Sequence, residues 1–382
     1  MPEIELARRQ RLQPAIQALG ADAALITSLP NVRYLTGLAS SNAALLLPAA
    51  AATGPADATG PAGADGPAGA AVLATDSRYE GAARRDAADL ELVIERFIEP
   101  ALARLAAERR LTRLAFEAQE MTVQRYQDLT AAFPSLELVP LGYAVEQLRM
   151  VKDEAEIALL AQACAITSQA VEQVLGSIRP GLTERELATA VERAMADLGA
   201  EQPAFETIVA SGPNGAIPHH VPSGRPLQAG DLITIDCGAR YAGYHADMTR
   251  TVALGPPADW QRDIYQLVAA AQQAGIDAAV PGAEVGQVDG AARGLISQAG
   301  HGDHFQHGLG HGVGLEVHEA PIMGYGRTGT LGDRVPITVE PGIYLPGQGG
   351  VRIEDTLVVR AAAGTAAPQE LLTTTTRELL VL

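Results

Sequence analysis

The first half of the chain alternates short apolar runs with segments whose apolar residues recur at helical spacing. Short apolar runs between turn formers are typical of buried strands, and the longer recurrence is typical of amphipathic helices. This alternation predicts an α/β domain. We expect strands at 23–27, 45–48, 71–75, 91–97, 111–117 and 136–140, a first helix that ends near residue 20, further helices at 78–89 and 100–108, and a turn at 29–38.

Residues 49–70 interrupt this pattern, because they are almost entirely Ala, Gly, Pro, Thr and Asp. Such a composition cannot bury a core. We therefore expect a flexible surface loop that carries no chemistry.

The pattern changes at residues 145–152, where a charged segment leads into an amphipathic run that ends at Gly176. We expect one long helix here, opening a second domain. Thr183 and Glu186 form a capping-box pair that begins another helix. The predicted domains are 1–147 and 148–382, and the second continues with a strand at 205–211, a loop at 211–224, a β-rich region from residue 231, and helices around 264–271 and at 285–298.

A short sequence is repeated within the β-rich region. Residues 233–238 read ITIDCG and residues 337–342 read ITVEPG, so an acid follows Ile-Thr-apolar in both. Further acids follow in the same order, in Asp-Met-Thr at 247–249 and in Glu-Asp-Thr at 354–356. Two matches in one order predict a duplicated half-domain with pseudo-twofold symmetry.

The four repeated acids fit two hairpins, one with Asp236 opposite Asp247 and one with Glu340 opposite Glu354. Each pairing puts a glycine at or beside the turn. Opposed residues of a hairpin project to one face, so each hairpin would hold two carboxylates side by side, which is costly unless a cation neutralises them. A single acid at a strand end is usually solvated, but four in this arrangement predict a site for two divalent cations. Oxygen ligands with one imidazole suit Mn²⁺, Co²⁺, Zn²⁺ or Fe²⁺.

Residues 306–319, QHGLGHGVGLEVHE, contain three of the eight histidines, spaced by glycines. We predict that His311 is the histidine ligand, with His307 and His318 beside it in the site. The segment does not match the phosphate-binding GxGxxG pattern, because Val313 stands at the third glycine. It also lacks the second histidine of HExxH, and the chain has no GxSxG elbow. Of the other histidines, we expect His220, His301 and His304 in loops, and His245 on the face of Asp247 as a supporting residue.

Composition limits the classes of partner. The chain has 28 Lys+Arg against 45 Asp+Glu, a net charge of −17, which opposes binding to nucleic acid and to anionic membrane surfaces. No stretch is apolar enough to span a bilayer, and the first residues lack the apolar core of a signal peptide. Two cysteines form neither CxxC nor a disulfide framework. We therefore expect a cytoplasmic protein.

Four segments together resemble the pita-bread metallopeptidases, a family that includes aminopeptidase P, prolidase, methionine aminopeptidase and creatinase. They are DCGARYAGYHADMTRT, HGLGHGVGLEVHE, ITVEPGIY and GGVRIEDT. NVRYLTG and ATDSRY resemble the creatinase-like N-terminal domain of that family more weakly. The resemblance implies a creatinase-like α/β domain followed by a pita-bread α+β catalytic domain.

The resemblance also implies five ligands of a dinuclear metal site, at Asp236, Asp247, His311, Glu340 and Glu354. Asp247 and Glu354 would bridge the metals, Asp236 would bind one, and His311 and Glu340 the other. All five positions are filled, which argues against the metal-free creatinase branch and against members that only bind partners.

Further roles follow from the same resemblance. His219 matches a histidine near the scissile carbonyl, His318 one that contacts the substrate, His307 another active-site histidine, and Arg352 one that supports the acids. A hydroxide between the two metals would attack the peptide carbonyl. Glu340 would move its proton, and His219 or His318 would stabilise the oxyanion.

The resemblance favours an Xaa-Pro aminopeptidase, with Mn²⁺ as the first candidate metal, peptides with proline at the second position as substrates, and a homodimer. Many prolidases carry an arginine that holds the carboxylate of a dipeptide, and Ile322 stands at that place. The alternatives are an Xaa-Pro dipeptidase, in which Arg327 could substitute, and a metal-dependent C–N hydrolase of other specificity.

Overall fold

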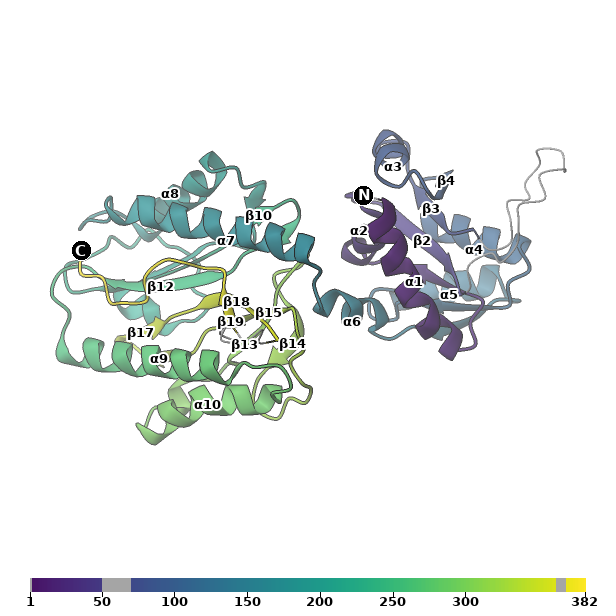
Figure 1. Ribbon diagram of the computed structural model, residues 1–382. Helices are drawn as coiled ribbons and strands as arrows, with labels where there is room; N and C mark the ends of the chain where they lie inside the picture. The colour runs from purple at the N-terminus through teal and green to yellow at the C-terminus, as the bar shows by residue number, and fades with distance from the viewer. Residues whose placement is uncertain (1, 50–69, 362–368) are drawn as a thin grey trace. The chain divides into compact units, whose positions relative to one another are not determined.

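The computed structural model describes residues 2–49, 70–361 and 369–382. The chain divides into two compact units, Met1–Arg149 and Met150–Leu382, coloured purple to blue and teal to yellow in Figure 1. Apart from its two end residues, the loop expected at 49–70 lies outside the described residues.

The N-terminal unit is built on one six-stranded sheet. Its strands are β1 (Ala23–Ile26), β2 (Ala43–Pro48), β3 (Val72–Thr75), β4 (Glu91–Ile94), β5 (Arg113–Phe116) and β6 (Glu137–Pro140). They lie in the order β4-β3-β2-β1-β5-β6, with β2 antiparallel to both of its neighbours and the other pairs parallel. All six overlap apolar runs that the sequence predicts as strands.

Within the described residues, six helices accompany this sheet: α1 (Pro2–Ala18), α2 (Leu29–Thr36), α3 (Glu80–Asp86), α4 (Ile98–Glu108), α5 (Val123–Ala132) and α6 (Ala144–Met150). The turn predicted at 29–38 is wrong, because α2 occupies it. Pro30 lies in the first turn of α2, where a missing N–H costs nothing, and Gly37 ends the helix with a φ of 75°. The sequence analysis did not predict α5, in which only Leu129 is buried.

The expected long helix at the domain boundary is two helices, α6 and α7 (Glu154–Leu175). Asp153 caps α7, since its side chain accepts from the Glu156 N–H while the Glu156 side chain accepts from the Asp153 N–H. This reciprocal cap begins a new helix at residue 154. The capping box of Thr183 and Glu186 is confirmed at the start of α8 (Glu184–Asp197).

The C-terminal unit contains the same arrangement twice. In the first half, α7 and α8 pack on the sheet β12-β9-β8, formed by β8 (Ile208–Ser211), β9 (Leu232–Cys237) and β12 (Met248–Ala253). In the second half, α9 (Asp259–Ala278) and α10 (Val285–Gln298) pack on the sheet β14-β13-β15-β18-β19. The strands of this sheet are β13 (Gly310–Gly312), β14 (Glu319–Met323), β15 (Val335–Val339), β18 (Asp355–Val359) and β19 (Gln369–Leu371).

Figure 1 shows these strands between the helix pair α7 and α8 and the helix pair α9 and α10. Short hairpins extend the two halves, namely β10 (Ala239–Tyr241) with β11 (Tyr244–His245), and β16 (Gly342–Leu345) with β17 (Gly349–Arg352). An α/β unit followed by a duplicated α+β unit confirms the predicted fold class. Within the described residues, no helix has the length and apolar character needed to cross a bilayer.

Candidate metal centre and substrate pocket

Asp236 and Asp247 belong to the hairpin of β9 and β12. Asp236 pairs with Thr249, so the expected opposition of Asp236 to Asp247 is wrong. The turn falls at Ala242 and Gly243, whose φ values of 47° and 83° are those of a type I′ turn. Asp247 precedes Thr249 by two positions and therefore projects to the same face, which keeps both acids on one side of the hairpin.

Glu340 and Glu354 lie opposite each other, as the sequence predicts. The ladder of β15 with β18 and the ladder of β16 with β17 lie on either side of these residues and share one register. The turn contains Gly347, with a φ of 76°. This hairpin therefore presents its two carboxylates side by side.

Two glycines allow β13 to approach its neighbours. A Cβ atom at Gly310 would lie 2.1 Å from the carbonyl oxygen of Thr338, and one at Gly312 would lie 2.1 Å from the carbonyl oxygen of Ala320. Any side chain at either position would displace a neighbouring backbone. The residue between them, His311, is thereby brought into the sheet next to the acids.

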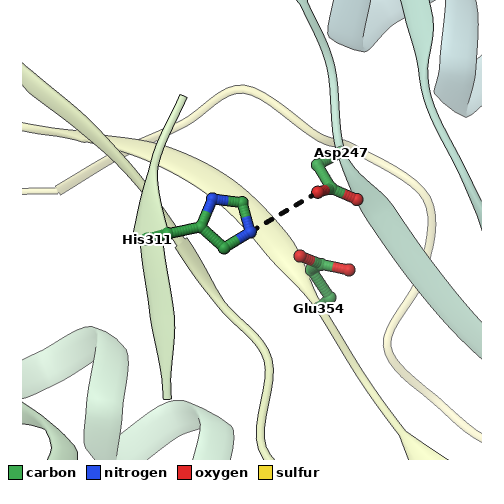
Figure 2. A group of neighbouring side chains, drawn as sticks. All are labelled: Asp247, His311 and Glu354. Atoms are coloured by element: carbon green, nitrogen blue, oxygen red, sulfur yellow. Dashed lines mark ion pairs between the residues drawn. The ribbon is translucent and has the colours of Figure 1, made fainter. Parts of the chain in front are cut away.

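One ring nitrogen of His311 faces these acids. Its Nε2 lies 3.7 Å from Asp247 Oδ2 and 3.5 Å from Glu340 Oε1. Its Nδ1 lies 3.0 Å from the carbonyl oxygen of Gly312, so we assign the proton to Nδ1 and a free lone pair to Nε2. Burial lowers the pKa of His311 to about 4, which keeps the ring neutral. Figure 2 shows His311, Asp247 and Glu354 converging, and one donor atom of each lies within 4.8 Å of the others.

The acids of the cluster are buried at high electrostatic cost. Asp236, Asp247 and Glu354 are 8%, 5% and 1% exposed. Burial, and then the neighbouring carboxylates, raise the pKa of Asp247 and of Glu354 well above the usual range, and burial raises the pKa of Glu340 to about 8. Asp236 Oδ1 and Glu354 Oε1 have no hydrogen-bond partner among the described residues. A cluster of this kind requires protons or cations.

Arg352 connects the acids to one another. Its Nη2 donates to Asp236 Oδ2 at 2.7 Å and its Nε to Thr249 Oγ1 at 3.0 Å, and Thr249 Oγ1 donates to Glu354 Oε2 at 2.8 Å. Its Nη1 donates to the Tyr344 hydroxyl at 2.9 Å. These contacts fix one oxygen of Asp236 and one of Glu354 and leave the other oxygen of each unbonded.

His307 lies at the end of this network. Its Nδ1 is 2.8 Å from the carbonyl oxygen of Gly308, and its Nε2 is 2.9 Å from the Tyr344 hydroxyl. We therefore assign the proton to Nδ1, with Tyr344 donating to Nε2 while it accepts from Arg352. Because both ring nitrogens are engaged, His307 is better suited to supporting the site than to exchanging a proton with a substrate.

His219 and His318 differ from His307, because neither ring forms a hydrogen bond or ion pair within the part of the chain that the structure describes. Both line a pocket of about 580 Å³, together with Asp236, His311 and Glu340. The ring of His318 lies edge-on to that of His311, with 4.4 Å between centroids. A pocket of this volume accommodates a small peptide.

The model of Metallopeptidase family M24 matches residues 158–361, and that of the Creatinase/Prolidase N-terminal domain matches residues 8–151. The chain belongs to metallopeptidase family M24. An Xaa-Pro dipeptidase of Pyrococcus furiosus is 46% identical over 237 residues, which cover 62% of this chain and 66% of that relative.

Two solved structures resemble this M24 metallopeptidase over nearly its whole length. An Xaa-Pro dipeptidase from Bacillus anthracis has a TM-score of 0.89 at 34% identity. The match covers 99% of this chain and 100% of the dipeptidase chain. An X-Pro aminopeptidase from Thermotoga maritima has a TM-score of 0.84 at 34% identity. That match covers 98% of this chain and 99% of the aminopeptidase chain. Both likenesses extend through the two units of the fold.

Membership of family M24 implies divalent metal ions, and the residues of this metallopeptidase fit them. The unbonded oxygens of Asp236 and Glu354 have no hydrogen-bond partner among the described residues, and His311 Nε2, which carries a free lone pair, faces Asp247 and Glu340. Carboxylate oxygens with one imidazole suit several divalent ions, so the donor set does not select one metal.

Thr249 and Tyr344 were not predicted as residues of this M24 centre. Both stand in the repeated segments, two positions after Asp247 and four after Glu340, so their period-two spacing from the acids was a usable signal. His220 lies in a loop, as expected, and it also lines the pocket. His301 and His304 contact each other, with 3.2 Å between their Nδ1 atoms, and neither lines the pocket.

Proposed function

We propose that this M24 metallopeptidase is an Xaa-Pro dipeptidase that works with two divalent metal ions. The observation that carries the proposal is the meeting of buried, incompletely bonded carboxylates with a neutral His311 in the wall of a peptide-sized pocket. The residues that would hold the ions are Asp236, Asp247, His311, Glu340 and Glu354.

Bound divalent metal would supply Lewis-acid activation of a water molecule and of the peptide carbonyl. Glu340 is suited to accept a proton from the water and pass it to the departing nitrogen, because its carboxylate lines the pocket and lies 3.5 Å from His311 Nε2. His219 and His318 would donate hydrogen bonds to the oxygen that gains negative charge. Arg352 would hold Asp236, and His307 would hold Tyr344 in place beside Arg352.

Specificity for dipeptides is favoured by the relatives. The Xaa-Pro dipeptidases of Pyrococcus furiosus and Pyrococcus horikoshii are 46% and 44% identical over 237 and 236 residues. The sequence-based preference for an aminopeptidase therefore receives no specific support, and its alternative fits better.

An Xaa-Pro aminopeptidase remains the second candidate because of one observation. Ile322, at 42% exposure, lines the pocket where a cation would bind the carboxylate of a dipeptide, and Arg327 is not among the lining residues. An apolar wall there leaves room for a longer peptide.

The deciding experiment compares hydrolysis of an Xaa-Pro dipeptide with that of the matching Xaa-Pro-Xaa tripeptide, after chelation and reconstitution with Mn²⁺, Co²⁺ or Zn²⁺. A dipeptidase gives the higher kcat/KM with the dipeptide. The reverse order would support the aminopeptidase, and activity that survives complete metal removal would exclude the proposed mechanism. Mn²⁺ is our first candidate metal, while a homodimer and a cytoplasmic location stay predictions.

A further inference from the structure

Glu184, the first residue of α8, lies outside the metal centre and is fully buried. Its carboxylate accepts six hydrogen bonds, three on each oxygen. Oε1 accepts from the Ser211 N–H at 2.9 Å, the Ser211 hydroxyl at 2.7 Å and the Asn214 amide at 2.9 Å. Oε2 lies 2.8 Å from His220 Nε2 and accepts from the Ser223 N–H at 3.1 Å and the Ser223 hydroxyl at 2.6 Å.

All six donors belong to one loop, residues 211–223, and Ser211 and Ser223 are its two ends. Residues 218–222, which lie between them, are consecutive and line the substrate pocket. His219 is the second residue of this stretch. A single side chain on α8 therefore closes the loop that forms one wall of the pocket.

The opposite side of the loop contacts the metal centre. Arg352 Nη1 donates to the carbonyl oxygen of Pro218 at 3.3 Å. A Cβ atom at Gly215 would lie 3.1 Å from the backbone nitrogen of Gly350 in β17, so the loop packs closely against that strand. His219 thus follows a residue held by Arg352 and precedes His220, whose ring is held by Glu184.

The chemistry of the contact requires a carboxylate. Burial acts to raise the pKa of Glu184, but the hydrogen bonds from Ser223, Asn214, His220 and Ser211 outweigh it and hold the pKa at about 2. An ionised carboxylate only accepts hydrogen bonds, which matches six donors. The amide of glutamine would turn an NH₂ group toward three of them, so three of the six hydrogen bonds would be lost in either orientation.

We propose that Glu184 is a positioning residue that holds the loop 211–223, and with it His219, where it meets the substrate. The part of this inference that concerns His219 rests on the proposed function. Glu184 itself touches neither the metal ligands nor the pocket, so its effect on catalysis would pass through the loop.

Glu184→Gln, measured on the metal-loaded protein, tests the inference in a double-mutant cycle with His219→Ala. We expect kcat/KM for an Xaa-Pro substrate to fall by about 10- to 100-fold in the wild-type background. In the His219→Ala background, the same substitution should cost less than about threefold, because the group that Glu184 positions is gone. The proposal would be overturned if Glu184→Gln lowered kcat/KM by the same factor in both backgrounds. It would also be overturned by a loss below threefold in the wild-type background.

Glu186→Gln is the matched control. Glu186 lies two residues further along α8, is exposed, and bonds only to Thr183 at the helix start. The control therefore weakens the end of the same helix without touching the loop. Its kcat/KM should stay within about twofold of wild type, and a loss matching that of Glu184→Gln would mean that helix stability, not loop position, explains the effect.

Hydrogen exchange separates this inference from the proposed function. Amides in 211–223 should exchange at least about tenfold faster in Glu184→Gln and at the wild-type rate in Glu186→Gln, with unchanged metal content. Unchanged exchange would exclude the anchor, whereas faster exchange in a protein that cleaves no Xaa-Pro peptide would exclude only the function. If Glu184→Gln does not fold, Asn214→Ala and Ser223→Ala, which remove one donor each, should show smaller shifts in the same direction, and their absence would refute the anchor.

Discussion

The buried acids should make the metal-free protein less stable as the pH rises, and Glu340 allows this effect to be measured. The folded protein holds the pKa of Glu340 at about 8, mainly through burial, against an ordinary value of 4.5. The folded state therefore binds the proton more tightly than the unfolded state does. The stabilisation is complete below pH 4.5 and is lost as the pH rises toward 8.

The size of the effect follows from the pKa difference. The Glu340 side chain is only 18% exposed, so solvent screening is limited. One pKa unit corresponds to about 1.4 kcal/mol, which gives an upper limit of about 5 kcal/mol for Glu340 alone. Between pH 5 and pH 8, about 3.5 kcal/mol of this should disappear from the free energy of unfolding. Bound divalent metal should remove the loss, because it neutralises the same carboxylates.

Urea unfolding followed by tryptophan fluorescence suits this test, because the single tryptophan, Trp260, packs against the core of α9 and α10. The unfolding free energies of metal-free wild type and metal-free Glu340→Gln are compared from pH 5 to 8. Contributions of the histidines that do not contact Glu340 cancel in the difference between the two proteins. A difference that stays constant within about 1 kcal/mol across this range would refute the electrostatic account of the site.

Three further outcomes are expected. His311→Ala should reduce kcat by at least about 100-fold and lower the bound metal per chain, with the melting temperature of the metal-free protein little changed; a globally unfolded variant would mean that the histidine is structural. Lys152→Met should lower the free energy of unfolding in urea by about 3–5 kcal/mol, because Glu319 would stay buried without the ammonium group that now lies 2.8 Å from its Oε2. The control is Arg360→Met, which removes the cation of the more exposed pair with Glu154. It should cost at most about 1 kcal/mol. Gly310→Ala should lower both stability and metal content, since its Cβ would meet a backbone oxygen at 2.1 Å, and retention of full metal content would contradict this account of β13.

The two hairpins show how much of the strand register can be predicted from local sequence. In the second, Gly347 lies midway between Glu340 and Glu354, and the register follows from that symmetry. In the first, the turn uses Ala242 at positive φ, a conformation that alanine rarely adopts. The expected pairing of Asp236 with Asp247 required a turn at Tyr241 and Ala242, one residue too early, so it gave Asp236 the wrong partner.

Long-range contacts were not accessible from the sequence. The donors to Glu184 lie 27 to 39 positions away, in a loop without periodicity. Glu184 read from the sequence is an ordinary acid in the first turn of a helix. The failure to predict helix α2 has a local cause. Pro30 and Asn31 are common turn formers, but here they begin a helix.

The location of the acids relative to the cores has a consequence for the order of assembly. The two apolar cores of the C-terminal unit, on α7 with α8 and on α9 with α10, contain none of the five proposed ligands. Because burial of apolar surface, and not metal binding, drives the formation of such cores, we expect the chain to fold before any ion arrives, unlike a zinc finger, whose fold forms only around its metal. Metal loading is then a separate and later event, and the ion that occupies a given preparation is set by what the cell or the buffer supplies at that moment.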